Sequence, residues 1–599
     1  MASATIDDLV GLEGFNAPVF LPDGSALLCL GPGDGVMQAW VVPLDGKPPR
    51  RLSFVPGERA MQARLSPDGT SAILSIDAGG DEHAQLYVVP TGGGNATRLT
   101  NAPGVIHTFG AWASDGKTIY FAANGRDKAR YDLHRMTLAT GKTETLVEKA
   151  ENLTTGGIQP GGALLPLFED HSHFNVGISF LDLRSGERRP IRLAGRTVRA
   201  TSFRWNRDGS ALYFVADGER DYLGVGRYLL AENRAEWLYT PDADVESIGL
   251  TSDGRIAANV NREGYSRIEL LSPEGQPTRV AIEPGGAVSE MSWSPDGKRL
   301  AFAFSTPTAG SLIRVFDAGS GTITAPMPLE PAGRLADTLV TPELVGFDSF
   351  DGVRLSGFFY RPRGAQPSRG WPAVMFVHGG PEGQTKASYR FDVQNLVESG
   401  YAVFTPNVRG STGYGRRYAG LDDRERRMDS VRDLGVCGNW LARQPGVDGK
   451  RLAIFGESYG GFMVLSALAE QPDLWQAGVD IFGVVNFETL IRDTGPWRRD
   501  HRAAEYGDPR TDPDLMRWLS PISRAGRIKA PLFVSHGDRD PRVPKSESDQ
   551  IVAFLKGRGN IVEYQEIEYE GHVYWRPDNR RRAYDGVRRF LDRHLAKNE

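Results

Sequence analysis

The stretch that decides the fold of the second half is LAIFGESYGGFMVLSALAE, residues 452–470. Its first four residues are apolar and predict a buried strand, and the residues after Gly460 predict a helix. Between the two, Ser458 has a glycine two positions before it and another two positions after it. Glycines there let strand and helix pack closely while the serine adopts a strained turn that exposes its hydroxyl. We therefore predict that Ser458 is a nucleophile.

The rest of the second half alternates apolar strands with amphipathic helices. The predicted strands are 373–377, 402–405, 452–455, 479–482, 532–535 and 562–566, and the predicted helices are 429–443, 460–470, 546–556 and 580–594. Strands that are apolar throughout are typical of parallel sheets with helices on both faces. Together with the motif at Ser458, this predicts an α/β-hydrolase domain over residues 336–599.

The first half contains a repeated Asp-Gly turn followed by an apolar strand. The turn aspartates are Asp23, Asp68, Asp115, Asp208, Asp253 and Asp296, with a step of about 45 residues and one double gap. Gly161-Gly162 lies in that gap and is interpreted as a degenerate turn, so the count becomes seven. Asp-Gly turns between alternating apolar residues predict hairpins, and this period is typical of propeller blades. We predict a seven-bladed β-propeller domain over residues 1–335, with its blades between about residues 15 and 330.

Length and composition limit the possible functions. The 599 residues suffice for two domains, and a formal charge of -5 offers no basic field for nucleic acid. No apolar run reaches the roughly 18 residues of a membrane span, and the first residues do not resemble a secretory signal. The only two cysteines, Cys29 and Cys437, lie far apart, which fits a reducing compartment. We expect a cytoplasmic protein without nucleic-acid or membrane partners.

A serine nucleophile needs a base and a carboxylate that orients it, and in this fold the chain order is serine, acid, histidine. The loop after strand 532–535 offers Asp538 and Asp540 at the carboxyl end of a strand, where parallel sheets place their sites. His572 follows the last predicted strand and precedes the last helix. This order predicts His572 as the base and leaves the acid open between the two aspartates.

Acyl transfer also needs hydrogen-bond donors for the oxyanion. The backbone N–H of Tyr459 is one candidate, because it follows the serine at the start of the helix. The loop after strand 373–377 reads His378-Gly379-Gly380-Pro381 and supplies the second, with Gly380 preferred and Gly379 as the alternative. This chemistry requires no metal ion and no cofactor.

These motifs together resemble the prolyl oligopeptidase family of serine peptidases, and most of all its acylaminoacyl peptidase and dipeptidyl peptidase branches. The shared segments are GESYGGFM at 456, HGGP at 378, NVRGSTGYGR at 407, EYGDP at 505, HGxxDxxVP at 536 and EGH at 570. The resemblance implies that Asp540, not Asp538, is the acid, and that Arg542 binds a substrate carbonyl or carboxylate. It also implies that the propeller caps the site, so that short peptides or small amides enter.

Three functions compete at this point. The first is a serine peptidase of the acylaminoacyl-, dipeptidyl- or aminopeptidase type, and the second is an esterase or amidase that uses the same triad on a small metabolite. The third is an inactive interaction protein, which the complete triad disfavours. No propeller segment matches the paired glutamates of dipeptidyl peptidases, and we interpret Asp81-Glu82 and Glu169-Asp170 as solvated loops. Association through exposed sheet edges would give a homo-oligomer.

Overall fold

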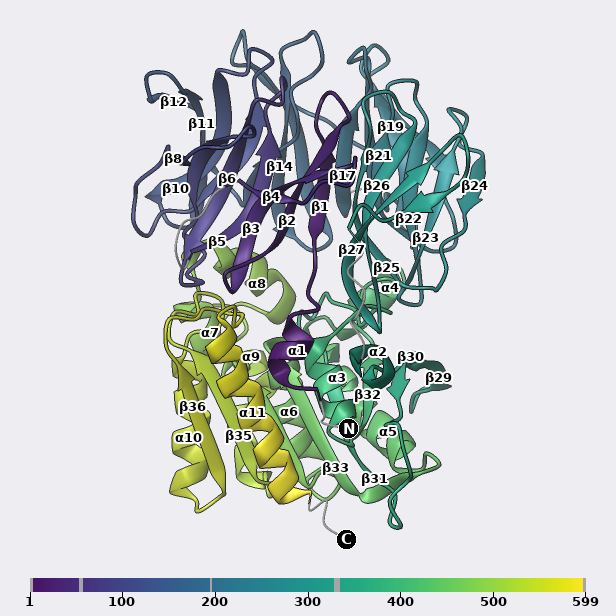
Figure 1. Ribbon diagram of the computed structural model, residues 1–599. Coiled ribbons are helices and arrows are strands. Elements are labelled where there is room, and N and C mark those ends of the chain that lie inside the picture. Colours follow the sequence, from purple (N-terminus) through teal and green to yellow (C-terminus); the bar gives the residue numbers. More distant parts are fainter. Residues whose placement is uncertain (1–3, 53–57, 194–196, 328–333, 596–599) are drawn as a thin grey trace.

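The computed structural model describes residues 4–52, 58–193, 197–327 and 334–595. Figure 1 shows a β-propeller stacked on an α/β domain, with the purple-to-teal strands above and the green-to-yellow elements below. None of the helices in these described ranges is long and apolar enough to cross a membrane.

The propeller consists of seven antiparallel sheets of four strands, as predicted. Blades one to four contain β1 (Asn16–Phe20), β2 (Ala26–Gly33), β3 (Val36–Pro43), β4 (Arg50–Arg51); β5 (Glu58–Leu65), β6 (Ser71–Ala78), β7 (Gln85–Pro90), β8 (Thr97–Arg98); β9 (His107–Trp112), β10 (Thr118–Asp127), β11 (Arg130–Thr137), β12 (Lys142–Ala150); and β13 (Leu153–Thr155), β14 (Leu164–Ser172), β15 (Asn175–Asp182), β16 (Arg188–Pro190). Blades five to seven contain β17 (Ala200–Trp205), β18 (Ala211–Ala216), β19 (Gly224–Leu229), β20 (Arg234–Tyr239); β21 (Asp244–Leu250), β22 (Ile256–Arg262), β23 (Tyr265–Leu271), β24 (Pro277–Val280); and β25 (Ala287–Trp293), β26 (Arg299–Thr306), β27 (Ala309–Asp317), β28 (Ile323–Thr324).

The Asp-Gly turns join the first and second strands of the blades. At the second blade, Asp68 accepts hydrogen bonds from the Ser66 hydroxyl at 2.6 Å and the Thr70 N–H at 3.1 Å, and Gly69 has a φ of 72°. A positive φ is accessible to glycine at little steric cost, which explains its place after the aspartate. The degenerate turn is confirmed as well, because Gly161 lies between β13 and β14 with a φ of 65°.

The propeller ring closes because the first blade packs against the last. Among the described residues, neither blade includes a strand from the other end of the propeller, since the first consists of β1–β4 and the last of β25–β28. Phe15 bridges the two ends: its N–H donates to the Ser311 carbonyl at 2.9 Å, and its carbonyl accepts from the Ser311 hydroxyl at 2.9 Å. Buried apolar side chains from both blades, including Leu27 and Ile313, form one core there. Burial of these faces stabilises the closed ring.

The second domain is built on one eight-stranded sheet with the order β29-β30-β32-β31-β33-β34-β35-β36. Its strands are β29 (Glu343–Asp348), β30 (Arg354–Tyr360), β31 (Trp371–Val377), β32 (Ala402–Asn407), β33 (Val447–Glu457), β34 (Ala477–Ile481), β35 (Leu532–Gly537) and β36 (Val562–Ile567). All neighbours from β32 to β36 are parallel, whereas β29 and β30 add an antiparallel edge that the sequence analysis did not predict.

Helices cover both faces of this sheet and create two separate cores. The helices of the domain are α2 (Arg334–Thr338), α3 (Phe391–Glu398), α4 (Arg416–Ala419), α5 (Arg427–Ala442), α6 (Tyr459–Glu470), α7 (Phe487–Asp493), α8 (Arg499–Tyr506), α9 (Pro513–Leu519), α10 (Ser546–Gly557) and α11 (Pro577–His594). Side chains of α5, α6 and α10 fill one core, and those of α3 and α11 fill the other. The predicted α/β-hydrolase arrangement is confirmed.

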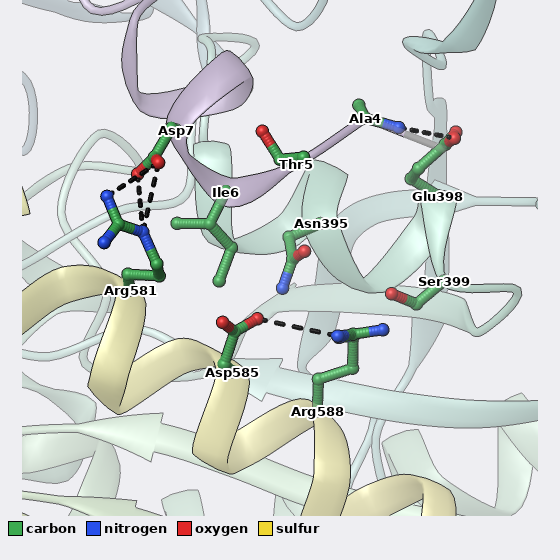
Figure 2. A pocket seen from close by; sticks show the side chains of 10 residues that line it. All are labelled: Ala4, Thr5, Ile6, Asp7, Asn395, Glu398, Ser399, Arg581, Asp585 and Arg588. Atoms are coloured by element: carbon green, nitrogen blue, oxygen red, sulfur yellow. Dashed lines mark hydrogen bonds and ion pairs between the residues drawn. The ribbon is translucent and has the colours of Figure 1, made fainter. Parts of the chain in front are cut away.

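The N-terminal helix α1 (Ile6–Val10) belongs with the second domain and not with the propeller. Its Ile6 and Leu9 are buried in the same core as α3 and α11. Figure 2 shows the polar pocket where these three helices meet, with Asp7 paired to Arg581 at 2.7 Å. The assignment of residues 1–335 to the propeller is therefore wrong for α1, because its apolar face is buried on the other domain.

The end of the propeller is described only in part. Its last strand, β28, ends at Thr324, and the predicted end of the blades at about residue 330 lies outside the described residues. The predicted boundary between residues 335 and 336 falls within α2. The position of the boundary stays a prediction.

The propeller sits on the carboxyl ends of the parallel strands. Gly80, in the connection between β6 and β7, lies so close to Gly571 that a Cβ on Gly571 would be 1.9 Å from the Gly80 carbonyl oxygen. Ion pairs also cross the interface, among them Arg130 with Asp500 at 2.9 Å and Arg416 with Asp217 at 2.9 Å. The edge of the sheet that carries the predicted site therefore faces the propeller.

Candidate active site

Ser458 occupies a strained turn between β33 and α6, with φ 59° and ψ -123°. A Cβ on Gly456 would lie 2.2 Å from the Gly460 carbonyl oxygen, and one on Gly460 would lie 2.3 Å from the carbonyl oxygen of Val377. Only glycine fits at these two positions, because strand and helix backbones meet there. The predicted local geometry of the serine is confirmed, and strain of this kind is concentrated at functional sites.

His572 lies between Ser458 and Asp540. Its Nε2 is 2.8 Å from the Ser458 Oγ, and its Nδ1 is 2.7 Å from the Asp540 Oδ2. An ionised carboxylate can only accept hydrogen bonds, so Nδ1 carries the proton and Nε2 is free to accept the proton of the serine. The ring also packs on Phe482, with 4.7 Å between centroids. Three residues far apart in the sequence thus form one continuous hydrogen-bonded chain.

Asp540 is held in its ionised form. Its Oδ1 accepts hydrogen bonds from the backbone N–H groups of Arg542 at 2.8 Å and Val543 at 3.0 Å. Burial acts to raise the pKa of Asp540, but the charges of His572 and His536 and its hydrogen bonds with them outweigh burial and lower it well below the usual range. A permanent carboxylate is what the orientation of His572 requires.

Asp538, the other candidate acid, does not reach the histidine. Its side chain is exposed to solvent, and its backbone N–H donates to the Ile567 carbonyl at 3.0 Å. Of the two aspartates that residue order left open, only Asp540 contacts His572. The loop between them decides this, because the chain turns inward after Arg539.

The candidate oxyanion donors lie on two sides of Ser458. Tyr459 is the first residue of α6, and the first N–H groups of a helix have no acceptor within the helix. The loop after β31 approaches from the other side, where a Cβ on Gly379 would be 3.3 Å from the Ser458 Cβ. The N–H groups of Gly379 and Gly380 donate to no other described residue. Both glycines are therefore available as donors.

Arg542 has a partner that the sequence analysis did not foresee. Its Nε is 2.6 Å from the Glu82 Oε1, and Glu82 comes from the propeller loop between β6 and β7. The Glu82 side chain is 15% exposed, so the interpretation of this acidic residue as solvated is wrong. The sequence feature that points to this contact is Gly79-Gly80, because the two glycines allow the tight turn that precedes Glu82. Glu169 also differs from the prediction, since it lies within strand β14 and not in a loop.

A buried ion-pair network supports the helix that follows the serine. Arg427 is fully buried and lies 3.0 Å from Asp422, 2.5 Å from Glu505 and 2.8 Å from the hydroxyl of Tyr459. Burial raises the pKa of Asp422 to about 6 and that of Glu505 to about 7, although the Arg427 charge opposes both shifts. Through Tyr459 this network fixes the residue that follows Ser458.

The same carboxylates form the one group with metal-ligand spacing that is found in the described part of the chain. It consists of Asp422, Asp423 and Glu505, whose oxygens lie within 4.8 Å of one another. Arg427 already pairs with two of the three carboxylates, so the guanidinium takes the place that a cation would occupy.

Comparison with known proteins agrees with the fold. Residues 387–598 match the family model of the prolyl oligopeptidase family. The dipeptidyl aminopeptidase BIII of Pseudoxanthomonas mexicana is 29% identical, in an alignment that covers 94% of this chain and 84% of that protein. The acylamino-acid-releasing enzyme of Sus scrofa is 26% identical over 49% of this chain and 42% of its own.

Two solved structures share the fold over the whole chain. The puromycin-hydrolyzing peptidase of Mycobacterium tuberculosis superimposes with a TM-score of 0.87 at 20% identity, covering 100% of this chain and 97% of that one. A Pyrococcus horikoshii acylaminoacyl peptidase gives a TM-score of 0.77 at 19% identity, covering 100% and 98%. The predicted resemblance to the prolyl oligopeptidase family is confirmed, because residues 387–598 match its family model and a relative named a dipeptidyl aminopeptidase aligns along most of this chain.

Proposed function

We propose that this peptidase cleaves short peptides through an acyl-enzyme formed on Ser458, with His572 as general base and Asp540 as the residue that orients it. The observation that carries the proposal is the hydrogen-bonded chain from the Ser458 Oγ through His572 to Asp540, with distances of 2.8 and 2.7 Å. Each role follows from the chemistry of the atom that makes the contact.

In the first half of the reaction, the Ser458 Oγ attacks the carbonyl carbon of the scissile bond while the His572 Nε2 takes the hydroxyl proton. Asp540 stabilises the imidazolium that forms, and the N–H groups of Tyr459 and Gly380 stabilise the oxyanion. His572 then protonates the leaving amine. In the second half, water attacks the acyl-enzyme with His572 again acting as the base.

The position of the propeller supports short peptides as the substrates. Its Gly80 loop is in contact with the residue before His572, and its Glu82 pairs with Arg542. A folded protein could not reach Ser458 past these contacts, whereas a flexible peptide or a small amide could. Because Glu82 occupies the Nε of Arg542, a substrate carbonyl would bind to the remaining N–H groups of the Arg542 guanidinium.

The subtype is a further part of the proposal. The relative that aligns over 94% of this chain is named a dipeptidyl aminopeptidase, and the acylamino-acid-releasing enzyme aligns over 49%, so both cleavage types need to be tested. The alternative substrate is an ester or amide of a small metabolite, because the triad does not select the leaving group.

The test is hydrolysis of four chromogenic substrates by the wild type and Ser458→Ala: a free aminoacyl anilide, an N-acetylated one, a dipeptidyl one and an aryl ester. We expect cleavage of at least one anilide by the wild type and a loss of about 10⁵-fold or more in the variant. Ester turnover without anilide turnover would replace the peptidase proposal with the metabolite alternative. Anilide turnover that survives in Ser458→Ala would refute the role of this serine.

We also propose that the protein is cytoplasmic and that it forms homo-oligomers. Cys29 and Cys437 are both buried and unpaired, which fits a reducing compartment. Cell fractionation would test the location, and recovery of the protein with a membrane or extracellular fraction would contradict it. Light scattering at several concentrations would test self-association, and a constant monomer mass would contradict it.

A further inference from the structure

Arg498 is a charged side chain near the proposed catalytic residues for which the mechanism has no use. It ends the short 3-10 helix Pro496–Arg498, directly before α8, which lies between the two domains in Figure 1. The guanidinium forms no ion pair or hydrogen bond with any described residue, and its Nε is buried without an acceptor. A buried donor without an acceptor is rare and costly in a folded protein, so this position calls for a ligand.

The segment that carries Arg498 is fixed against the catalytic loop. The N–H of Gly495 donates to the carbonyl of Pro541 at 3.0 Å, and Pro541 is the residue directly after Asp540. On the propeller side, Trp497 packs edge-on against His83 with 5.9 Å between ring centroids. Arg498 is therefore held at the interface of the two domains, where it is partly buried.

The unpaired charge around Arg498 is positive, because the nearby glutamates already pair with other arginines. Arg502 pairs with Glu382 at 3.1 Å, and Arg542 pairs with Glu82 at 2.6 Å, so both glutamates are already used. Asp170 on β14 contacts the same helix, but its side chain lies 3.7 Å from the ring of His501 and is not paired with Arg498.

The pKa of Arg498 reflects this imbalance. Burial, together with the charges of Arg502 and Arg542, lowers it to about 10. Glu82 and Tyr506 act in the opposite direction without restoring the usual value. An additional anion at this place would relieve the repulsion among the three arginines.

The neighbours of Arg498 also border the proposed reaction site. Arg542 is two residues after Asp540, and Glu382 is two residues after Gly380. Tyr506 stacks on Tyr459, the residue after the nucleophile, with 6.5 Å between centroids. A group bound to Arg498 would thus lie beside the peptide that is being cleaved.

We propose that Arg498 binds a carboxylate of the substrate, so that the site prefers short peptides with a carboxylate close to the scissile bond. The carboxylate would come from a free C-terminus or from an aspartate or glutamate side chain. Arginine suits this task because its planar donors match the two oxygens of a carboxylate. The inference rests on the proposed peptidase function and adds a substrate class to it.

The experiment compares pairs of peptides that differ only in one charge. One pair has the same sequence with a C-terminal carboxylate or a C-terminal amide, and the other pair is amidated and carries glutamate or glutamine beside the scissile bond. Each pair is assayed for kcat/KM with the wild type, Arg498→Gln and Arg498→Lys. Arg499→Gln is the matched control, because Arg499 is the next residue and is exposed to solvent.

We expect the wild type to prefer the charged member of at least one pair by about 10- to 100-fold, the range of a charge-assisted hydrogen bond. The ratio should fall to near one in Arg498→Gln, remain partly in Arg498→Lys and stay unchanged in Arg499→Gln. The pair that shows the preference identifies the source of the carboxylate. An unchanged kcat/KM for the neutral peptide reports that the variant is folded and that its triad is intact.

A wild type that treats both members of both pairs alike would overturn the proposal, and so would an Arg498→Gln variant that keeps the preference. Calorimetric binding of the same peptides to Ser458→Ala, with and without Arg498→Gln, provides a readout that does not need turnover. Selective binding without hydrolysis would contradict the proposed peptidase function and support the carboxylate site. Hydrolysis without charge selectivity would support the proposed peptidase function and contradict the carboxylate site.

Discussion

The replacement Asp540→Asn tests the orientation of the histidine most directly, because the structure determines how the new amide must lie. The Asp540 Oδ1 accepts two backbone N–H groups, from Arg542 at 2.8 Å and Val543 at 3.0 Å. An asparagine can satisfy both donors only with its carbonyl oxygen, so its NH₂ group is forced to face the Nδ1 of His572.

That arrangement gives the histidine the wrong tautomer. Nδ1 must then accept a hydrogen bond, and the proton moves to Nε2, which lies 2.8 Å from the Ser458 Oγ. A protonated Nε2 cannot take the proton of the serine. We expect kcat to fall by about 10⁴-fold, or about 5.5 kcal/mol in activation free energy, while the fold is kept.

The assay is steady-state hydrolysis of the best anilide substrate, with thermal unfolding measured on the same preparations. Asp538→Asn is the matched control, because its exposed side chain has no contact with His572 and should leave kcat within about twofold. An Asp540→Asn variant that retains a tenth of the wild-type rate would refute this reasoning. A loss in Asp538→Asn as large as that in Asp540→Asn would also refute it.

Two further predictions concern the scaffold of the site. Arg427→Met leaves the two buried carboxylates that Arg427 bridges without their cation, which should cost about 3–5 kcal/mol in the free energy of unfolding. The folded pKa values of these carboxylates lie above the unfolded ones, so the free energy of unfolding that Arg427→Met loses in urea denaturation should be larger at pH 8 than at pH 5. An equal or smaller loss at pH 8 would contradict the role of Arg427 as the cation of these carboxylates. Gly571→Ala puts a Cβ 1.9 Å from the carbonyl oxygen of Gly80, so it should separate the propeller loop from the catalytic loop, lower kcat/KM and raise the rate of proteolysis between the domains. Gly557→Ala, where a Cβ meets nothing within 4 Å, should change neither quantity, and equal effects of the two alanines would contradict a specific contact.

Local patterns predicted the repeated turns of the propeller and the parallel strands of the second domain, because each of these patterns has a local cause. The turn at Asp68 needs only the hydrogen bonds of its own four or five residues, and the turn at Ser458 needs only glycines that are close in the sequence. Strand β34 ends at Ile481 and not at Phe482, a difference of one residue that the apolar pattern could not resolve. The antiparallel edge strands β29 and β30 were missed, because an alternating, half-exposed strand such as β29 resembles a loop in composition.

The sequence by itself predicted a propeller followed by an α/β domain, the number of blades, and the candidate nucleophile and base, because repeats, glycine spacing and chain order carry that information along the chain. Only the tertiary structure brought Asp540 to His572, placed Glu82 on Arg542 and put α1 on the second domain. It also left Arg498 without a partner among the described residues. Glu82 and Arg542 are separated by 460 positions, and contacts at that distance depend on how the two domains pack. Packing satisfies charges and buries apolar faces between elements, and no local pattern records which elements will meet.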